Sequence, residues 1–194
     1  MRHHKEKKPS IRIVVGGPPN SGKSTFSECI ARALQDLDID AESIELDVFA
    51  PTLDYIKRKI TREERDKRKQ EPVTKEKIEK AVKRFKSASN KHDIVIGDAP
   101  GRISKESKLL CRIATHGIII CREDESSEIE NWKSFFEELN IPIVVVIISK
   151  LDGEESIIPS EMIHATLVNL HREQIQITEY IRLLSVLLKE RLPI

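Results

Sequence analysis

The chain has 194 residues, of which 39% are hydrophobic and 34% are charged, and its formal net charge is +1. This length and composition predict one globular domain, large enough for a sheet covered on both faces. No apolar stretch approaches the roughly 18 to 20 residues that span a bilayer, and the polar N-terminus lacks the apolar core of a secretion signal. We therefore expect a cytoplasmic protein without a membrane span.

The cysteines are an odd number at wide spacings without a C-x-x-C pair, which excludes a disulfide framework and a zinc site. They are Cys29, Cys111 and Cys121. Residues 1–10 form a basic tail before the predicted domain, 11–194. The adjacent His3 and His4 in that tail are more typical of solvated side chains than of a metal site.

The most specific motif follows the first apolar run, Ile11–Gly16. Residues 17–24 read GPPNSGKS, which fits G-x-x-x-x-G-K-[ST], and a helix-like stretch opens at Thr25. This order of strand, loop and helix predicts a phosphate-binding loop, or P-loop. Lys23 would reach the β- and γ-phosphate oxygens, and the Ser24 hydroxyl would bind Mg²⁺. The residues expected to contact the nucleotide are Gly17, Pro18, Pro19, Asn20, Ser21, Gly22, Lys23, Ser24 and Thr25.

A second apolar run, Ser43–Leu46, ends in Asp47. At the edge of the sheet on the γ-phosphate side, this carboxylate would orient water or deprotonate an acceptor hydroxyl. A helix-capping aspartate is an equally good interpretation, and Asp54 is a weaker candidate for the same catalytic role.

The segment between Lys57 and Lys91 holds fifteen Lys and Arg against six Asp and Glu. We expect a helical excursion from the domain over about 55–91, with one helix over 55–70, a break at Glu71-Pro72 and a second helix capped by Thr74. Two interpretations stay open: a solvated helix pair, or a lid that holds a polyanion such as an acceptor's phosphate or a nucleic-acid backbone.

The next run, Ile94–Ile96, leads into Asp98 and the sequence D-x-x-G, which ends at Gly101. A carboxylate at the end of a buried strand beside the P-loop strand supports Mg²⁺ in nucleotide-hydrolysing proteins. We expect Asp98 to hold the metal through water and the Gly101 N–H to contact the γ-phosphate. Arg102 stands where some small GTPases place a water-orienting glutamine, so fast unaided hydrolysis is not expected.

Two continuously apolar runs, Gly117–Cys121 and Ile143–Ile148, are typical of central strands buried on both faces. After the second comes Ser149-Lys150-Leu151-Asp152, which is similar to the guanine-reading pattern [NT]-K-x-D. In that pattern the Asp152 carboxylate would bind the base edge and the Lys150 stem would pack on the ring. A surface turn explains the segment equally well, so the choice of base stays open.

A short strand at His164–Leu170 and a closing helix at Gln174–Leu192 complete the predicted elements. Strand-length runs alternate with helix-length segments along the chain. This alternation predicts an α/β protein with the three-layer P-loop NTPase fold, in which helices cover both faces of a mostly parallel sheet.

The elements GPPNSGKS, DVFAP, DAPGR and SKLDG resemble, in order and spacing, the nucleotide site of signal-recognition-particle-type GTPases and of related metal-insertion and ParA-like NTPases. The resemblance covers residues 11–153 but shows no final base-contacting loop after Gly153. It implies site roles for Gly17, Lys23, Ser24, Asp47, Asp98, Gly101, Lys150 and Asp152.

The chain also resembles the P-loop domain linked to CRISPR-associated ring nucleases. The similarity rests on GGPPNSGKS, DAPGRIS, the run from Ala114 through His116 to Ile120, Glu130-Asn131-Trp132 and the late segment Leu167–Arg172. It implies action together with a partner, a segment Ser149–Gly153 that need not read guanine, and a structural or site-adjacent His116.

These observations predict a P-loop enzyme that binds ATP or GTP with Mg²⁺ and hydrolyses or transfers the γ-phosphate. Lys23, Asp47 and Asp98 are the expected catalytic residues, and Ser24 and Asp98 the expected metal ligands. One alternative is a kinase with a phosphorylated acceptor. Another is a slow nucleotide-dependent switch that acts on a protein partner. Nucleic-acid binding through residues 57–91 and the oligomeric state stay open.

Overall fold

The computed structural model describes residues 10–171 and 175–193. Its central element is a seven-stranded sheet with strand order β2-β3-β1-β4-β5-β7-β6. The strands are β1 (Ile11–Gly16), β2 (Ala41–Glu45), β3 (Ile94–Asp98), β4 (His116–Arg122), β5 (Ile143–Lys150), β6 (Ser156–Ile158) and β7 (Ile163–Val168). All neighbours pair in parallel except β6 and β7, which are antiparallel. The mostly parallel sheet is therefore confirmed.

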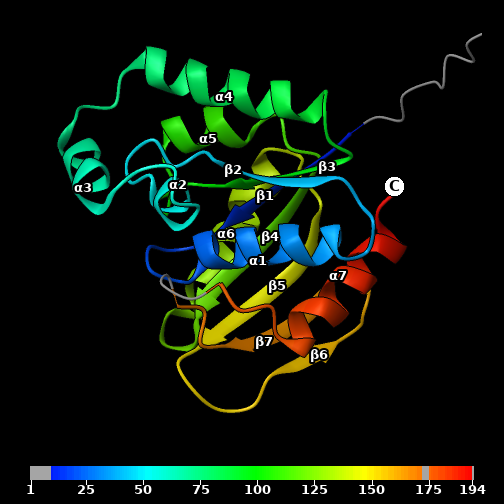
Figure 1. Cartoon of the computed structure of the whole chain (residues 1–194). Coiled ribbons are helices and arrows are strands. Elements are labelled where there is room, and N and C mark those ends of the chain that lie inside the picture. Colours follow the sequence, from blue (N-terminus) through cyan, green and yellow to red (C-terminus); the bar gives the residue numbers. More distant parts are fainter. Residues whose placement is uncertain (1–9, 172–174, 194) are drawn as a thin grey trace, which may run out of the picture.

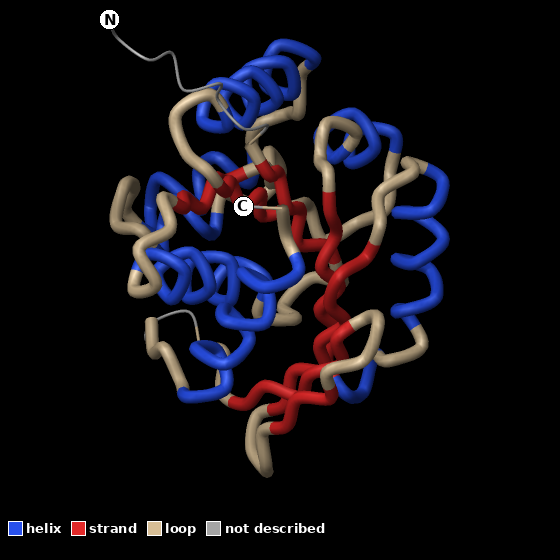
Figure 2. The backbone as a smooth tube through the Cα atoms, turned by 90° about the vertical axis from the view of Figure 1, so that its right-hand side faces the viewer, coloured by secondary structure: helices blue, strands red, loops and turns tan. Residues whose placement is uncertain are grey.

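Helices cover both faces of this sheet (Figures 1 and 2). One face carries Ile13, Ile96 and Ile118 and packs against α1 (Lys23–Gln35) and α7 (Glu179–Arg191). The other carries Val14, Val95 and Ile119 and packs against the remaining long helices. These are α4 (Lys75–Ser89), α5 (Lys105–Cys111) and α6 (Glu128–Glu138). Alternate residues of one strand thus enter two separate cores, which explains why these strands read as continuous apolar runs.

Central positions for β4 and β5 are confirmed, because each lies between two parallel neighbours. The short strand predicted near residue 164 is also confirmed as β7, whereas β6 was not predicted. The strand β6 pairs only with β7 at the sheet edge, and its side chains are mostly exposed. With three residues, β6 is too short to show the periodic pattern that marks the other strands.

The single helix expected over 55–70 is wrong. Two helices stand there, α2 (Thr52–Ile56) and α3 (Arg62–Gln70). Arg58 adopts a positive φ of 55° between them, and a capping box starts α3, in which Thr61 and Glu64 satisfy each other's backbone N–H groups. The break at residues 71–72 and the Thr74 cap of α4 are confirmed.

The closing helix begins later than predicted. Residues 172–174 lie outside the described part of the chain, and α7 starts at Glu179 because the Thr178 side chain accepts from the Ile181 N–H at 3.3 Å. The helix α7 packs along α1, so the chain end closes the face of the sheet that holds the P-loop helix (Figure 1).

Candidate nucleotide site

The predicted P-loop connects the carboxyl end of β1 to the start of α1. Gly17 has φ 146° and Gly22 has φ 90°, and both values lie in the region that favours glycine. A Cβ atom on Gly17 would stand 1.9 Å from the Ile120 carbonyl oxygen, and one on Gly22 would stand 2.9 Å from the Leu170 Cβ. Backbone strain and close packing therefore both require glycine at these positions.

The polar groups of the loop fit a phosphate-bearing ligand. Within the described residues, the buried hydroxyls of Ser21 and Thr25 have no hydrogen-bond partner. Buried donors of this kind are rare in folded proteins, and phosphate oxygens would satisfy them. The Lys23 ammonium is buried with them and donates to the Pro18 carbonyl at 2.7 Å, so it is held over the loop.

A cavity of about 440 Å³ opens beside the loop, and we call it the γ-side cavity. It is lined by Pro19, Asn20, Gly22, Lys23, Ser24, Asp47, Phe49, Ala50, Thr52, Lys69, Asp98, Ala99, Pro100, Gly101 and Arg102. The fold thus gathers residues from three separate motifs, those of the P-loop, of Asp47 and of Asp98. A Cβ on Gly101 would stand 2.8 Å from the Pro19 backbone nitrogen, so the D-x-x-G turn packs directly against the P-loop.

Asp98 ends β3, which pairs directly with the P-loop strand, and Asp98 aligns with Val15 across the two strands. Its side chain is 1% exposed. No group of three or more His, Cys, Asp or Glu side chains in the described residues is arranged to hold a metal ion. Protein sites for Mg²⁺ commonly use one or two carboxylates together with substrate phosphates and water, and Asp98 is the carboxylate that this site offers beside the P-loop.

Asp47 lies in the loop between β2 and α2. Its Oδ1 accepts from the Phe49 N–H at 2.9 Å and from the Ala50 N–H at 3.0 Å. The N-cap of α2 is Pro51, so Asp47 is not the helix cap that its sequence position equally allowed. Burial raises the pKa of Asp47, although the two N–H groups and the charges of Lys23 and Lys69 oppose this shift. A carboxylate with a raised pKa that faces the cavity has the chemistry of a general base.

Glu45 is the residue that sequence reasoning missed. It aligns with Asp98 across β2 and β3 and is 4% exposed. Its carboxylate accepts from the Asp47 N–H at 2.9 Å, the Leu53 N–H at 2.7 Å and the Asp54 N–H at 3.3 Å. Burial and the negative charges of its neighbours Asp98, Asp47 and Asp54 raise the pKa of Glu45 well above its usual range. Glu45 therefore fixes the loop that carries Asp47.

A second cavity, of about 660 Å³, lies on the other side of the P-loop, and we call it the base-side cavity. Lys150 and Asp152 line it together with Asn20, Ser21 and Gly22, so the SKLDG segment does meet the P-loop. The Lys150 ammonium pairs with Glu123 at 2.6 Å, and Asp152 is exposed. The cavity is also lined by Asn169, Leu170 and His171. The sequence shows no final base-contacting loop after Gly153, and these residues occupy the side of the cavity where such a loop would stand.

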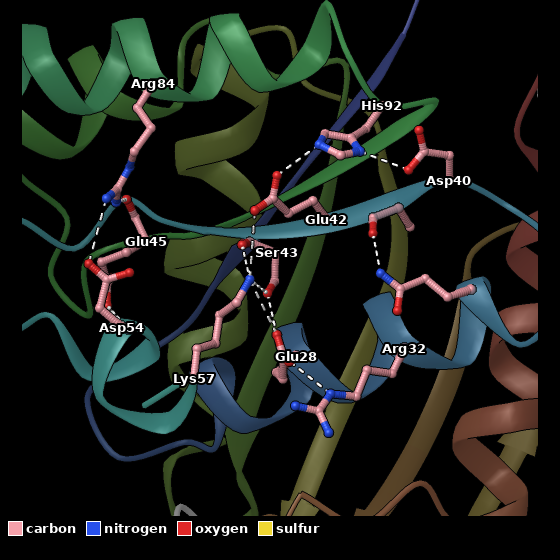
Figure 3. Close-up of polar contacts among 12 residues, drawn as sticks. Glu28, Arg32, Asp40, Glu42, Ser43, Glu45, Asp54, Lys57, Arg84 and His92 are labelled. Atoms are coloured by element: carbon pink, nitrogen blue, oxygen red, sulfur yellow. Dashed lines mark hydrogen bonds and ion pairs between the residues drawn. The ribbon is translucent and has the colours of Figure 1, made fainter. Parts of the chain in front are cut away.

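Other candidates lie elsewhere. Asp54 is buried, with its Oδ2 3.6 Å from the Arg84 Nη1 (Figure 3), and it does not line the γ-side cavity. His116 starts β4 at the sheet end opposite the P-loop, half-buried, with its Nδ1 3.0 Å from the Thr115 hydroxyl. It is structural. His3 and His4 lie outside the described residues.

Comparisons with known proteins agree with this architecture. The family model described as "Chromatin associated protein KTI12" matches residues 12–106, just under half of the chain. The septum site-determining protein MinD from Pyrococcus horikoshii, solved with Mg-ADP, has a TM-score of 0.55 at 15% identity over 72% of this chain and 70% of its own. This chain has the P-loop NTPase fold.

Two further solved structures share that fold. The signal recognition particle 54 kDa protein of Aeropyrum pernix, in complex with GDP, has a TM-score of 0.53 at 20% identity over 75% of this chain and 36% of its own. The kinase domain of the Escherichia coli tyrosine kinase ETK has a TM-score of 0.52 at 16% identity over 74% and 68%. A search of curated proteins gave no match. No helix in the described residues is long and apolar enough to cross a membrane.

Proposed function

We propose that this chain binds ATP or GTP together with Mg²⁺ and hydrolyses the triphosphate or transfers its γ-phosphate. One observation carries the proposal: the γ-side cavity joins Lys23 and Ser24 of the P-loop with Asp98 of β3 and Asp47 after β2. A P-loop fold alone would not require a buried carboxylate beside the P-loop strand and a second carboxylate across the cavity.

Each of these residues has a distinct role in the proposal. The Lys23 ammonium neutralises charge on the β- and γ-phosphates, and the Ser24 hydroxyl and Asp98 hold Mg²⁺, with Asp98 acting through water. The bound Mg²⁺ would supply charge stabilisation at the phosphates. The Gly101 N–H contacts the γ-phosphate, and Asp47 takes the proton of the attacking hydroxyl or water.

The base-side cavity holds the nucleoside in this proposal. Asp152 would accept from the base edge, and Asn169 to His171 would close the pocket that Lys150 borders. The ion pair between Lys150 and Glu123 competes with packing of the Lys150 stem on a base, so adenine and guanine both stay candidates.

The test is a binding titration of the purified chain with ATP and with GTP, each with and without Mg²⁺, followed by phosphate release. Lys23→Ala should weaken triphosphate binding at least tenfold, whereas Lys86→Ala, on the exposed surface of α4, should not. Asp152→Asn should lower a preference for GTP and leave a preference for ATP unchanged. Equal binding by Lys23→Ala and the parent chain would overturn the proposal.

A kinase is favoured over simple hydrolysis by a further cavity, bordered by the basic helices α3 and α4, which shares Asp47 with the γ-side cavity. Release of ADP or GDP that depends on an added acceptor would distinguish the two. A slow switch is the other candidate, because Arg102 rather than a glutamine lines the γ-side cavity. Its signature is slow turnover that a protein partner accelerates, and the ring-nuclease resemblance makes such a nuclease the first partner to test.

A further inference from the structure

Another cavity, of about 320 Å³, lies beside the γ-side cavity between the loop after β2 and helices α3 and α4. We call it the basic cavity. It is lined by Glu45, Asp47, Val48, Pro51, Asp54, Arg68, Glu71, Lys77, Lys80, Ala81 and Arg84. Four of these side chains are cationic and four are carboxylic acids, and the cavity takes its name from the basic helices α3 and α4 that border it. Asp47 lines both cavities, so the proposed general base stands where they meet.

The fold holds the two basic helices in place around this cavity. The Arg65 guanidinium of α3 is buried over the Tyr55 ring, 4.7 Å from its centroid. In α4, Ile78, Ala81 and Phe85 are buried in the core beneath the helix. The cations of both helices therefore project from fixed helices, and the consecutive residues Arg68 and Lys69 line the basic and the γ-side cavity respectively.

Two of the four cations already have protein partners. Arg84 donates to the Glu45 carbonyl and pairs with Asp54 (Figure 3), and Lys77 pairs with Glu71 at 2.8 Å. In the described part of the chain, neither Arg68 nor Lys80 forms an ion pair or a side-chain hydrogen bond. The charge of Arg68 does act on the neighbouring carboxylates of Glu64 and Glu71. The basic cavity thus presents two cations that are not held in a close ion pair, with Asp47 on its lining.

The size and lining of the cavity favour a small ligand. Its volume is at the low end for ligand pockets. Phe85 is fully buried and Tyr55 lies under Arg65, so neither aromatic ring lines the basic cavity or offers a face on which a base could stack. A nucleic acid would be held here by its phosphates alone, whereas a compact phosphate monoester fits a cavity of this size.

We propose that the basic cavity binds the phosphate group of a small phosphorylated acceptor, whose free hydroxyl reaches Asp47. This inference rests on the proposed function and selects the kinase form of it. In the reaction, the acceptor oxygen forms a bond to the γ-phosphorus as the bond from that phosphorus to the β,γ-bridging oxygen breaks. The hydroxyl proton passes to the Asp47 carboxylate, and the electron pair of the broken bond leaves with the nucleoside diphosphate.

The experiment uses the full chain with its P-loop filled by a non-hydrolysable triphosphate analogue and Mg²⁺. Inorganic phosphate is then titrated calorimetrically. In a separate assay, ATP or GTP replaces the analogue, and ribose 5-phosphate as a model acceptor should increase the release of the nucleoside diphosphate. Arg68→Ala and Lys80→Ala should each weaken phosphate binding at least tenfold, and Lys86→Ala should not change it. All three side chains are exposed, so each variant loses one surface charge.

The outcomes separate the two proposals. If the analogue fails to bind, the proposed function fails. If the analogue binds and phosphate does not, or if Arg68→Ala and Lys80→Ala bind phosphate as the parent chain does, only the acceptor inference is overturned. A short single-stranded RNA provides the last test. If this RNA binds although inorganic phosphate does not, and if its binding is lost in the same two variants, the acceptor inference is overturned in favour of a nucleic-acid surface.

Discussion

Replacing Glu45 by alanine should destabilise the domain by about 3 kcal/mol, because the Glu45 carboxylate is the acceptor for three backbone N–H groups. Two of these N–H groups, those of Leu53 and Asp54, are buried, and the third, that of Asp47, is partly buried. Each buried donor left unpaired costs about 1–3 kcal/mol. Relief of the repulsion between Glu45 and Asp98 offsets part of this cost.

Glu45→Gln is the second variant to compare with Glu45→Ala, because glutamine keeps the size of the side chain and one acceptor oxygen. Its single oxygen can still accept from Leu53 and Asp54, while its amide group faces the Asp47 N–H. Glu45→Gln should therefore cost only about 1 kcal/mol, the loss of one hydrogen bond. Because that bond fixes Asp47, we expect catalysis to fall more than stability does in this variant.

The assay is thermal and urea unfolding followed by circular dichroism. For a domain of this size, about 3 kcal/mol corresponds to a drop in Tm of roughly 6–12 °C. Glu79→Ala is the matched control, because the Glu79 carboxylate is exposed and, among residues 10–171 and 175–193, pairs only with Lys75, at 3.6 Å. This variant should change stability by less than about 1 kcal/mol. If Glu45→Ala unfolds with the same free energy as the parent chain, the carboxylate does not hold this loop.

Three further predictions concern the site and the core. Asp98→Asn should weaken nucleotide binding only when Mg²⁺ is present, and an equal loss without the metal would indicate misfolding instead. Burial raises the pKa of Asp47, and protonation removes the base, so the catalytic rate should fall as the pH decreases, with a midpoint above the ordinary aspartate pKa of about 3.9. Asp47→Asn should abolish this pH step in the rate that remains. Burial raises the pKa of the Cys29 thiol to about 11 and the pKa values of the Cys111 and Cys121 thiols to about 12. A thiol reagent should therefore label these three residues only in the unfolded chain. Rapid labelling of the native chain would contradict their burial.

The sequence was sufficient for the parts of this site that are local in the chain. The P-loop is specified by eight consecutive residues, and Asp98 is marked by the buried strand that it ends. Positions of this kind follow from short-range rules, because a parallel strand ends at the same edge of the sheet as its neighbours.

The parts that could not be predicted depend on contacts between distant residues. Glu45 gains its role only when β2 aligns with β3 and brings it beside Asp98, and no local pattern sets that alignment. The base-side contribution of Asn169 to His171 requires β7 to lie next to β5, which places these residues against Gly22. The sequence did predict β7, and parallel strands carry site residues at their carboxyl ends. The residues directly after β7, which include Asn169, could therefore have been proposed as site residues.

The break between α2 and α3 was missed although part of its signal is local, namely the capping box of Thr61 and Glu64 that starts α3. The other part is tertiary: the Lys57 ammonium donates to the Ser43 carbonyl at 2.7 Å and to its hydroxyl at 2.9 Å and lies 3.6 Å from Glu28 (Figure 3). These contacts hold Lys57 at the end of α2 and turn the chain away from a helical path. Tertiary structure overrides propensity here.

The same buried network relates the basic helices to the P-loop. Burial lowers the pKa of Lys57, while the Ser43 hydroxyl and the charge of Lys57 outweigh the burial of Glu28 and lower the pKa of that carboxyl. A buried ion pair contributes little net stability, because desolvation offsets its attraction. Its value in this fold is geometric: Glu28 lies on α1, which starts at the catalytic Lys23 candidate, and Lys57 ends α2. The start of the basic segment after α2 is therefore attached to the P-loop helix α1. This attachment holds the basic cavity and the γ-side cavity next to each other, with Asp47 on the lining of both.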